Sequence, residues 1–150
     1  MQRELKIRID DIPDIDERPL KIGAIKGKRA TYRYIYFNQP AGEVLKITKK
    51  PEGTFKTVIR ARDGKFDIIS SDRVDNENKL LREFTNKFGI KKEIVNQRLF
   101  FVLDDDKLSL NNIRDVGRFL IIEGKNPSTE IIDRLGIKNP EVITKSFDEL

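Results

Sequence analysis

The chain has 150 residues, enough for one domain with a buried core, and we expect a single domain over residues 1–150. It carries 30 Lys and Arg residues against 25 Asp and Glu residues, and this net charge of +5 favours anionic partners without selecting one. Cysteine and histidine are both absent, which excludes disulfides, thiolate catalysis, and histidine as a general base or metal ligand.

The opening segment MQRELKIRID alternates between polar and apolar residues. Polar residues occupy positions 2, 4, 6 and 8, and apolar residues occupy positions 5, 7 and 9. A period of two residues indicates a strand with one apolar and one charged face. The charged face points either to water or into a polar interior.

Further strands follow, separated by turn residues. An acidic connection with two prolines covers 10–19 and can hold a short helix. The next β-type runs lie at 30–37, 43–49, 54–62 and 65–70. The turns between them are NQPAG, KPEG and Asp-Gly, so these strands should form antiparallel hairpins.

The period then changes to that of a helix over about 76–88. Four apolar side chains recur at helical spacing: Leu80, Leu81, Phe84 and Phe88. Asp75 or Asn76 can cap the start of this helix, and Gly89 can end it.

Three more strands are predicted at 93–103, 107–112 and 117–123, followed by two short helices. Pro127 and Pro140 lie near the starts of these helices, and Gly136 ends the first. About eight strands joined mostly by hairpins predict an antiparallel α+β domain, and a barrel is one architecture that fits this count. Either its charged faces meet solvent, or the barrel has a polar lumen with helices covering its apolar exterior.

Two isolated charges and one aromatic stripe stand out in these strands. Arg98 and Glu123 lie in otherwise apolar runs, where a charge is costly unless it is paired or functional. Tyr32, Tyr34 and Tyr36 could stack on a base, or pack beneath a covering helix. The basic GKR at 27–29 lacks a phosphate-loop pattern and is expected to be solvated.

Four segments resemble the CYTH family, the triphosphate tunnel metalloenzymes. QRELKIR at 2–8 resembles the ExExK signature, and YIYF followed by VLKIT resembles a YF…LRIR segment. LSLNNIRDVGRFLIIE and LGIKNPEVITKSFDEL resemble the two closing segments, in the same order over nearly the whole chain. The resemblance implies an eight-stranded antiparallel β-barrel with covering helices, whose inward cations bind a triphosphate and whose inward carboxylates hold a divalent metal.

The resemblance also implies roles for individual residues. Glu4 and Glu123 would hold Mg²⁺ or Mn²⁺, and Glu4 and Lys6 would be catalytic. The expected phosphate-binding residues are basic side chains at matching positions: Lys6, Arg8, Lys46, Arg60, Arg62, Arg98 and Lys145. Oxygen ligands suit these metals, and Arg binds phosphate oxygens bidentately.

Five positions depart from the family pattern. Gln2, Asn111 and Ile121 stand where acidic residues are expected. Thr48 replaces an Arg, and Phe147 replaces a closing Tyr. The phosphate-binding half of the implied site is therefore better preserved than its metal-binding half.

The leading expectation is a cytoplasmic enzyme that binds a small-molecule triphosphate or polyphosphate and hydrolyses it with a divalent metal. Two alternatives stay open: a class IV-type adenylate cyclase, and a phosphate- or nucleotide-binding protein without full catalytic activity. The chain has no apolar run of membrane-spanning length and no signal-peptide core, so no membrane partner is expected. The absence of long basic clusters counts against long nucleic acid as a partner.

Overall fold

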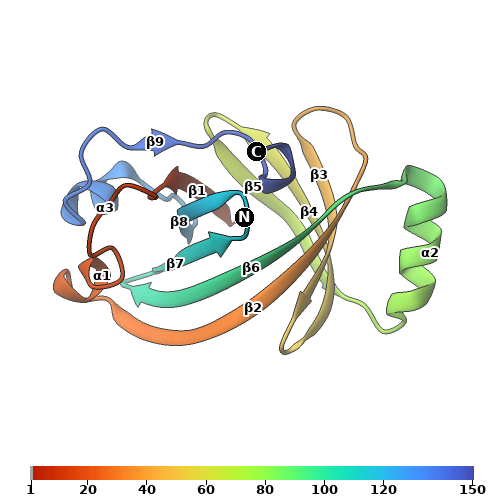
Figure 1. The fold of residues 1–150 in the computed structure, drawn as a ribbon, viewed down its shortest axis with the longest axis horizontal. Helices are drawn as coiled ribbons and strands as arrows, with labels where there is room; N and C mark the ends of the chain where they lie inside the picture. Colours follow the sequence, from red (N-terminus) through yellow and green to blue (C-terminus); the bar gives the residue numbers. More distant parts are fainter. Residues whose placement is uncertain (1) are drawn as a thin grey trace.

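The computed structural model describes residues 2–150, and β-strands dominate this range (Figure 1). The strands are β1 (Arg3–Arg8), β2 (Ile25–Phe37), β3 (Glu43–Lys50), β4 (Gly53–Arg62), β5 (Lys65–Arg73), β6 (Ile90–Leu103), β7 (Asp106–Ile113), β8 (Gly117–Gly124) and β9 (Glu141–Val142). The helices are α1 (Arg18–Lys21), α2 (Glu77–Phe88), α3 (Thr129–Arg134) and the 3₁₀ turn η1 (Phe147–Glu149).

The first eight strands form a closed antiparallel barrel, as predicted. Their order is β5-β4-β3-β2-β6-β7-β8-β1, and β5 also pairs with β1. That closing pairing places Arg3 opposite Asp67 and Glu4 opposite Phe66. The short β9 continues the sheet beyond this point by pairing with the end of β1. Closure pairs the edges that an open sheet would expose.

The faces of β1 decide between the two arrangements left open by the sequence. Leu5 and Ile7 are buried in an apolar cluster on the outside of the barrel, formed with Ile132 and Leu135 at α3. Successive side chains of a strand point to opposite faces, so the charged face of β1 points inward. Lys6, which is only 5% exposed, lies on that inner face.

A second external cluster lies beneath α2. Phe84 packs edge-on against Phe37 of β2, with ring centres 5.4 Å apart. Asn76 caps the helix by accepting a hydrogen bond from the backbone N–H of Lys79, and Gly89 ends it with a φ of 79°. Figure 1 shows α2 at one end of the molecule and α1 and α3 at the other.

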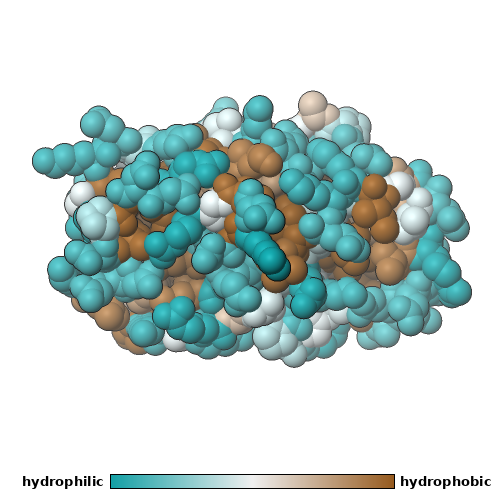
Figure 2. Space-filling model, in the orientation of Figure 1, coloured by the Kyte–Doolittle hydropathy of each residue, from teal (hydrophilic) through white to brown (hydrophobic). Residues whose placement is uncertain are grey.

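Helices and charged side chains leave a largely hydrophilic exterior on the face that Figure 2 shows, with smaller hydrophobic patches between. None of the helices within residues 2–150 has both the length and the apolar character needed to span a bilayer.

Two segments differ from the sequence prediction. β2 begins at Ile25, so the GKR segment expected in a connection belongs to a strand, with a bulge between Lys26 and Arg29. Its three residues are exposed, as expected. The helix predicted after Pro140 is wrong, because this segment forms β9 and η1 instead. Its backbone pairs with β1, where the N–H of Ile143 donates to the carbonyl of Lys6 at 2.8 Å, and this tertiary pairing overrides helix propensity.

Candidate triphosphate-binding tunnel

The barrel encloses a cavity of about 610 Å³. Phe66 and Phe147, both 3% exposed, line its closed end. The rim at the other end is formed by the exposed residues Lys28, Glu52 and Lys107. The cavity volume lies within the range of roughly 300–1,000 Å³ typical of small-molecule sites.

Six cationic side chains line this cavity, and two of them, Lys28 and Lys107, lie at its rim. The four inner ones are Lys6 from β1, Lys46 and Lys50 from β3, and Arg98 from β6. In the described range 2–150, none of these four forms an ion pair with a carboxylate. Lys6 and Lys46 are buried, and buried charges are normally paired, so this cluster indicates an anionic ligand.

Aromatic rings pack against three of these cations. The Nζ of Lys6 lies 3.8 Å from the Phe147 ring centre, and that of Lys46 lies 4.0 Å from the Tyr34 ring centre. The guanidinium of Arg98 lies 4.9 Å from the Tyr32 ring centre. Ring faces attract cations without cancelling their charge, so the positive potential remains available to a bound anion.

Burial disfavours the charged form of a lysine, and this effect lowers the pKa values of the two buried lysines. Burial lowers the pKa of Lys6 to about 7; Glu4 partly opposes this, and Lys46 reinforces it. Burial likewise lowers the pKa of Lys46 to about 8. A polyanion in the cavity would favour the charged form of both lysines.

Arg98 also has hydrogen-bonding capacity to spare. Its Nη2 donates to the hydroxyl of Ser109 at 2.8 Å. Its Nε is buried and has no hydrogen-bond partner within the described part of the chain. An unpaired buried donor is costly, and a phosphate oxygen is a suitable acceptor for it.

Two carboxylates lie beside the cations. Glu4 of β1 is directly opposite Glu123 of β8, and both line the cavity. Burial and the nearby charge of Glu4 both raise the pKa of Glu123. Directly opposed residues of antiparallel strands have Cβ atoms about 4.5–5.5 Å apart, so the two carboxylates could share one cation.

These two carboxylates are the acidic residues that the sequence analysis expected to remain at the metal-binding part of the site. No cluster of three or more acidic side chains suited to a metal occurs within residues 2–150. Mg²⁺ is commonly bound by one or two carboxylates, with substrate phosphates and water as its other ligands. Glu4 and Glu123 therefore suit a metal that arrives with, or is completed by, a phosphate ligand.

Three of the departures from the family pattern have structural roles here. The hydroxyl of Thr48 lies 3.1 Å from that of Thr57 across β3 and β4. The amide of Asn111 donates to the backbone carbonyl of Ser109 at 3.1 Å, so it is committed to the barrel wall. Ile121 is buried directly opposite Lys6. Gln2 and Phe147, the other two departures, also line the cavity.

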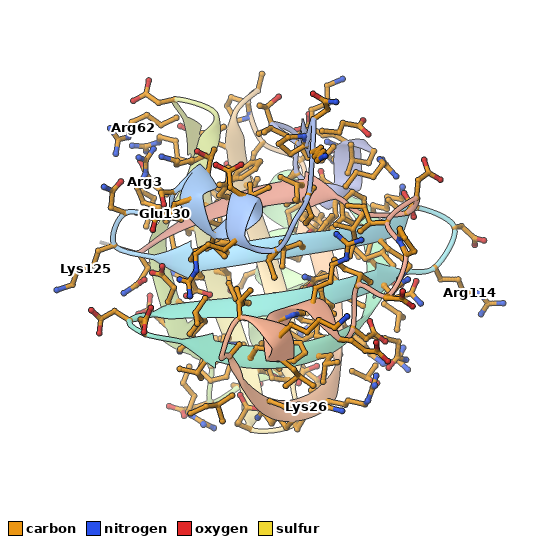
Figure 3. The ribbon with its side chains drawn as sticks, turned by 90° about the vertical axis from the view of Figure 1, so that its left-hand side faces the viewer. Arg3, Lys26, Arg62, Arg114, Lys125 and Glu130 are labelled. Atoms are coloured by element: carbon orange, nitrogen blue, oxygen red, sulfur yellow. The ribbon has the colours of Figure 1, made fainter. Side chains whose placement is uncertain are left out.

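Two predicted phosphate-binding residues of β4 lie outside the cavity. Thr57 and Ile59 line it, so Arg60 and Arg62, which alternate with them, face outward. Arg60 lies 3.9 Å from Glu43. Arg62 pairs with Asp67 at 2.6 Å and is found on the exterior in Figure 3.

Arg8 and Lys145 are also not among the residues that line the cavity. Arg8 shares a strand face with Lys6 but lies beyond the closed end, where its guanidinium donates to Asp10 at 2.9 Å. Lys145 is exposed, and its backbone carbonyl accepts a hydrogen bond from Lys6 Nζ at 3.4 Å. Of the predicted site residues, the cavity thus brings together Glu4, Lys6, Lys46, Arg98 and Glu123. The other four lie outside it: Arg8, Arg60, Arg62 and Lys145.

The site contains residues that sequence reasoning did not select. Lys50 lines the cavity, and its spacing from Lys46 and Thr48 was a usable signal, because all three share one face of β3. Phe100 also lines it, with its ring centre 5.8 Å from that of Tyr32, which the sequence had already singled out with Tyr34 and Tyr36. No local signal distinguishes the Phe100 ring from a core residue.

Comparisons with known proteins agree with this geometry. No protein-family model matches the chain. The chain is 27% identical, over 98% of its length and 96% of the relative's, to a Methanocaldococcus jannaschii protein named "Putative adenylate cyclase MJ0240". The solved structure of the PH1012 protein from Pyrococcus horikoshii superposes with a TM-score of 0.86, at 22% identity and with 100% and 99% of the two chains covered.

A more distant structure carries a functional description. The Hippeastrum protein HpAC1 is described as a "putative adenylyl cyclase" with a dominant triphosphatase activity. It superposes with a TM-score of 0.63 at 13% identity, covering 97% of this chain and 92% of its own. The closed barrel with cations lining its interior defines a tunnel fold. In particular, the chain has the triphosphate tunnel fold of the CYTH family, as the sequence resemblance predicted.

Proposed function

We propose that the protein binds a triphosphate in its barrel and hydrolyses it with a divalent metal. The observation that carries the proposal is the group of four inner cavity cations that have no carboxylate partner in the described chain: Lys6, Lys46, Lys50 and Arg98. An inorganic triphosphate carries about four negative charges at neutral pH, which matches this group. The proposal does not require the four predicted basic residues that lie outside the cavity: Arg8, Arg60, Arg62 and Lys145.

In this proposal the residues divide the work between binding and metal holding. Lys6 and Lys46 neutralise the buried end of the phosphate chain, and Arg98 fixes an oxygen through its free Nε donor. Glu4 and Glu123 would hold Mg²⁺ or Mn²⁺ against the phosphates. When bound, the metal would supply charge neutralisation and polarise the phosphoryl group that water attacks.

The test is an assay of product and metal dependence. The protein is incubated with tripolyphosphate, ATP and thiamine triphosphate, each with Mg²⁺, with Mn²⁺, and with EDTA. Release of inorganic phosphate or pyrophosphate that requires the metal is the expected result. Absence of any turnover with all three compounds and both metals would overturn the hydrolase proposal.

A cyclase is the second candidate, favoured by the name of the Methanocaldococcus relative. The same assay separates the two reactions, because cyclisation of ATP yields cyclic AMP and pyrophosphate without consuming water. Chromatography of the ATP reaction identifies the nucleotide product. ADP or AMP supports hydrolysis, and cyclic AMP supports cyclisation.

A binding protein without turnover is the third candidate, favoured by the neutral residues at three expected acidic positions, Gln2, Asn111 and Ile121. Tripolyphosphate would then raise the melting temperature without being consumed, since a ligand that binds only the folded state stabilises it. The melting temperature and the phosphate released are measured on the same samples.

A further inference from the structure

The seam between β1 and β5, where the barrel closes, is short. Within residues 2–150, β1 pairs with β8 over six residue pairs but with β5 over two. Those two pairs are Arg3 with Asp67 and Glu4 with Phe66. Glu4, an expected metal ligand, therefore lies beside the shorter of these two pairings.

The Glu4 carboxylate has no polar partner in the described part of the chain. It is half-buried, and within residues 2–150 it forms neither an ion pair nor a side-chain hydrogen bond. The position of such a side chain depends on the backbone that carries it. The placement of β1 at the seam thus decides where Glu4 meets Glu123, its partner across β8.

A group of charged side chains joins the strands on the outer side of this seam. Glu4 and Phe66 line the cavity, so the neighbouring residues Arg3 and Asp67 face outward. The Asp67 carboxylate accepts hydrogen bonds from Arg3 Nε and from Arg62 Nε, both at 2.6 Å. Arg3 Nη2 also donates to the backbone carbonyl of Arg62 at 2.9 Å. We call Arg3, Arg62 and Asp67 the seam clasp, and Figure 3 shows its two arginines next to each other on the exterior.

The contact between Arg3 and Asp67 is the part of the clasp that reaches β1. Arg62 and Asp67 belong to the β4–β5 hairpin, so their ion pair is local to that hairpin. The side chains of Arg3 and Asp67 are 14% and 6% exposed, whereas that of Arg62 is 53% exposed. Short hydrogen bonds between charged groups are strong when water is largely excluded, and exposed pairs contribute little. Arg3 and Asp67 therefore tie β1 to the hairpin.

The inward neighbours of these two residues both belong to the candidate site. Glu4 follows Arg3 in the chain, and Phe66 precedes Asp67. The Phe66 ring centre lies 4.5 Å from Lys6 Nζ. Mg²⁺ accepts oxygen ligands within a narrow range of about 2.0–2.1 Å, so a small shift of β1 against β5 would displace Glu4 from a productive position.

We infer that Arg3 and Asp67 are positioning residues, which hold Glu4 in place for the metal from the outer side of the barrel. The inference rests on the proposed function, because the metal is part of that proposal. Neither residue lines the cavity, so neither contacts a ligand bound there. Their loss should affect the metal more than the phosphates, since Lys46 and Arg98 lie on other strands.

The test compares Arg3→Gln with Arg62→Gln. Each variant removes one guanidinium from Asp67 and one positive charge, but Arg3 lies on β1 and Arg62 does not. Titration calorimetry measures tripolyphosphate affinity in EDTA and in Ca²⁺ or Mn²⁺, with any turnover monitored. The ratio of the affinities with and without metal is the metal-coupled gain.

Arg3→Gln should reduce the metal-coupled gain about five- to tenfold, the lower end of the effects seen when residues behind a metal ligand are changed. Its affinity in EDTA should stay within about twofold of the wild type, because a charge on the outer wall is screened. Arg62→Gln should keep the gain within about twofold, since it leaves both hydrogen bonds of Arg3 in place.

Asp67→Asn is a second variant that tests the same contact. The amide keeps the size of the side chain but has one acceptor atom, so it should reduce the gain as Arg3→Gln does. The double variant should lose no more than the larger single loss, because both changes act through one contact. The Mn²⁺ concentration for half-maximal turnover should rise about fivefold in Arg3→Gln. Thermal melts separate these effects from stability, because a purely structural clasp lowers the melting temperature without changing the gain.

The outcomes distinguish the inference from the proposed function. An unchanged gain in Arg3→Gln, or equal losses in Arg3→Gln and Arg62→Gln, overturns the inference and leaves the triphosphatase proposal standing. A loss of gain confined to Arg3→Gln and Asp67→Asn, in a protein without turnover, supports the inference and overturns the hydrolase proposal. A wild type in which neither metal raises tripolyphosphate affinity overturns the inference together with the metal site.

Discussion

The ammonium group of Lys6 lies 3.8 Å from the centre of the Phe147 ring, at the closed end of the barrel. The ring of Phe66 lies on another side of the same ammonium, with its centre 4.5 Å away. A single hydrogen bond to the backbone carbonyl of Lys145, at 3.4 Å, is its polar contact with the C-terminal segment. The charge on Lys6 at neutral pH is therefore sensitive to whatever else enters the cavity.

Proton uptake on ligand binding is the first prediction. Since burial lowers the pKa of Lys6 to about 7 and of Lys46 to about 8, both are partly neutral at pH 8 in the free protein. Tripolyphosphate favours their charged forms, so binding at pH 8 without metal should take up protons. Affinity should fall at least about tenfold between pH 7 and pH 9. Titration calorimetry in buffers of different ionisation enthalpy measures the uptake.

The control for this experiment is Lys6→Arg, because Arg stays protonated throughout this range. That variant should take up fewer protons than the wild type, and its affinity should depend less on pH. Constant affinity from pH 7 to pH 9 in the wild type, with no proton uptake, would contradict the assignment of Lys6 and Lys46 as phosphate ligands.

The second prediction concerns stability without ligand. Lys6→Met removes a buried charge and keeps an unbranched apolar side chain, so it should raise the free energy of unfolding by about 1–3 kcal/mol at pH 7. The pKa of Lys6 is lower in the folded state than its ordinary value of 10.5. Between pH 7 and 10.5 the unfolded state therefore binds more protons, and wild-type stability should gain from rising pH.

Urea unfolding of both proteins at pH 7 and pH 9 measures this difference. The advantage of the Lys6→Met variant should shrink at pH 9, since the wild-type lysine is then largely neutral when folded. The same variant should lose tripolyphosphate binding. A Lys6→Met protein that is less stable than the wild type at pH 7 would show that the lysine is a structural residue.

The barrel could be predicted from the sequence because its signals are local. Alternation in β1 and the turns at 50–53 and 63–64 specify strands and hairpins without any knowledge of distant contacts. The helix at Glu77–Phe88 is likewise specified by its own cap and apolar spacing. These features depend on neighbours a few residues away, which a sequence displays directly.

The parts of the site that could not be predicted depend on register and on distant packing. Strand β4 has the sequence GTFKTVIRAR. Apolar residues fall on both of its faces, such as Val58 and Ile59, so its pattern does not say which face turns inward. Arg60 and Arg62 therefore could not be excluded from the lumen. The position of Phe147 depends on the C-terminal segment reaching back across the barrel to Lys6, and no local pattern encodes that contact.

The third prediction separates metal holding from phosphate binding. Glu4→Gln should lower metal-dependent turnover by about a hundredfold or more, because it leaves Glu123 as the one carboxylate of the opposed pair. Without metal, the same variant should bind tripolyphosphate at least as tightly as the wild type, since a negative charge beside the phosphates is lost. Phosphate release and metal-free titration calorimetry measure the two effects.

Glu43→Gln is the matched control, because Glu43 is exposed and pairs with Arg60 outside the cavity. It should change neither quantity by more than about twofold, as expected for an exposed pair. Wild-type turnover in Glu4→Gln would remove Glu4 from the metal site.

The fourth prediction compares an inner and an outer arginine. Arg98 is half-buried in the lumen and has a buried, unpaired Nε donor within the described chain, whereas Arg60 is 57% exposed at its side chain, on the outer wall. Arg98→Met should weaken tripolyphosphate binding by about 10- to 100-fold, the value of a hydrogen bond to a charged group. Arg60→Met removes the same charge and should change affinity by less than about twofold, because exposed charges are screened. Titration calorimetry at 0.15 M salt measures both, with thermal melts as the folding check. Equal losses of tripolyphosphate affinity in the two variants would mean that the anion responds to the overall charge of the protein. That result would contradict the lumen as the binding site.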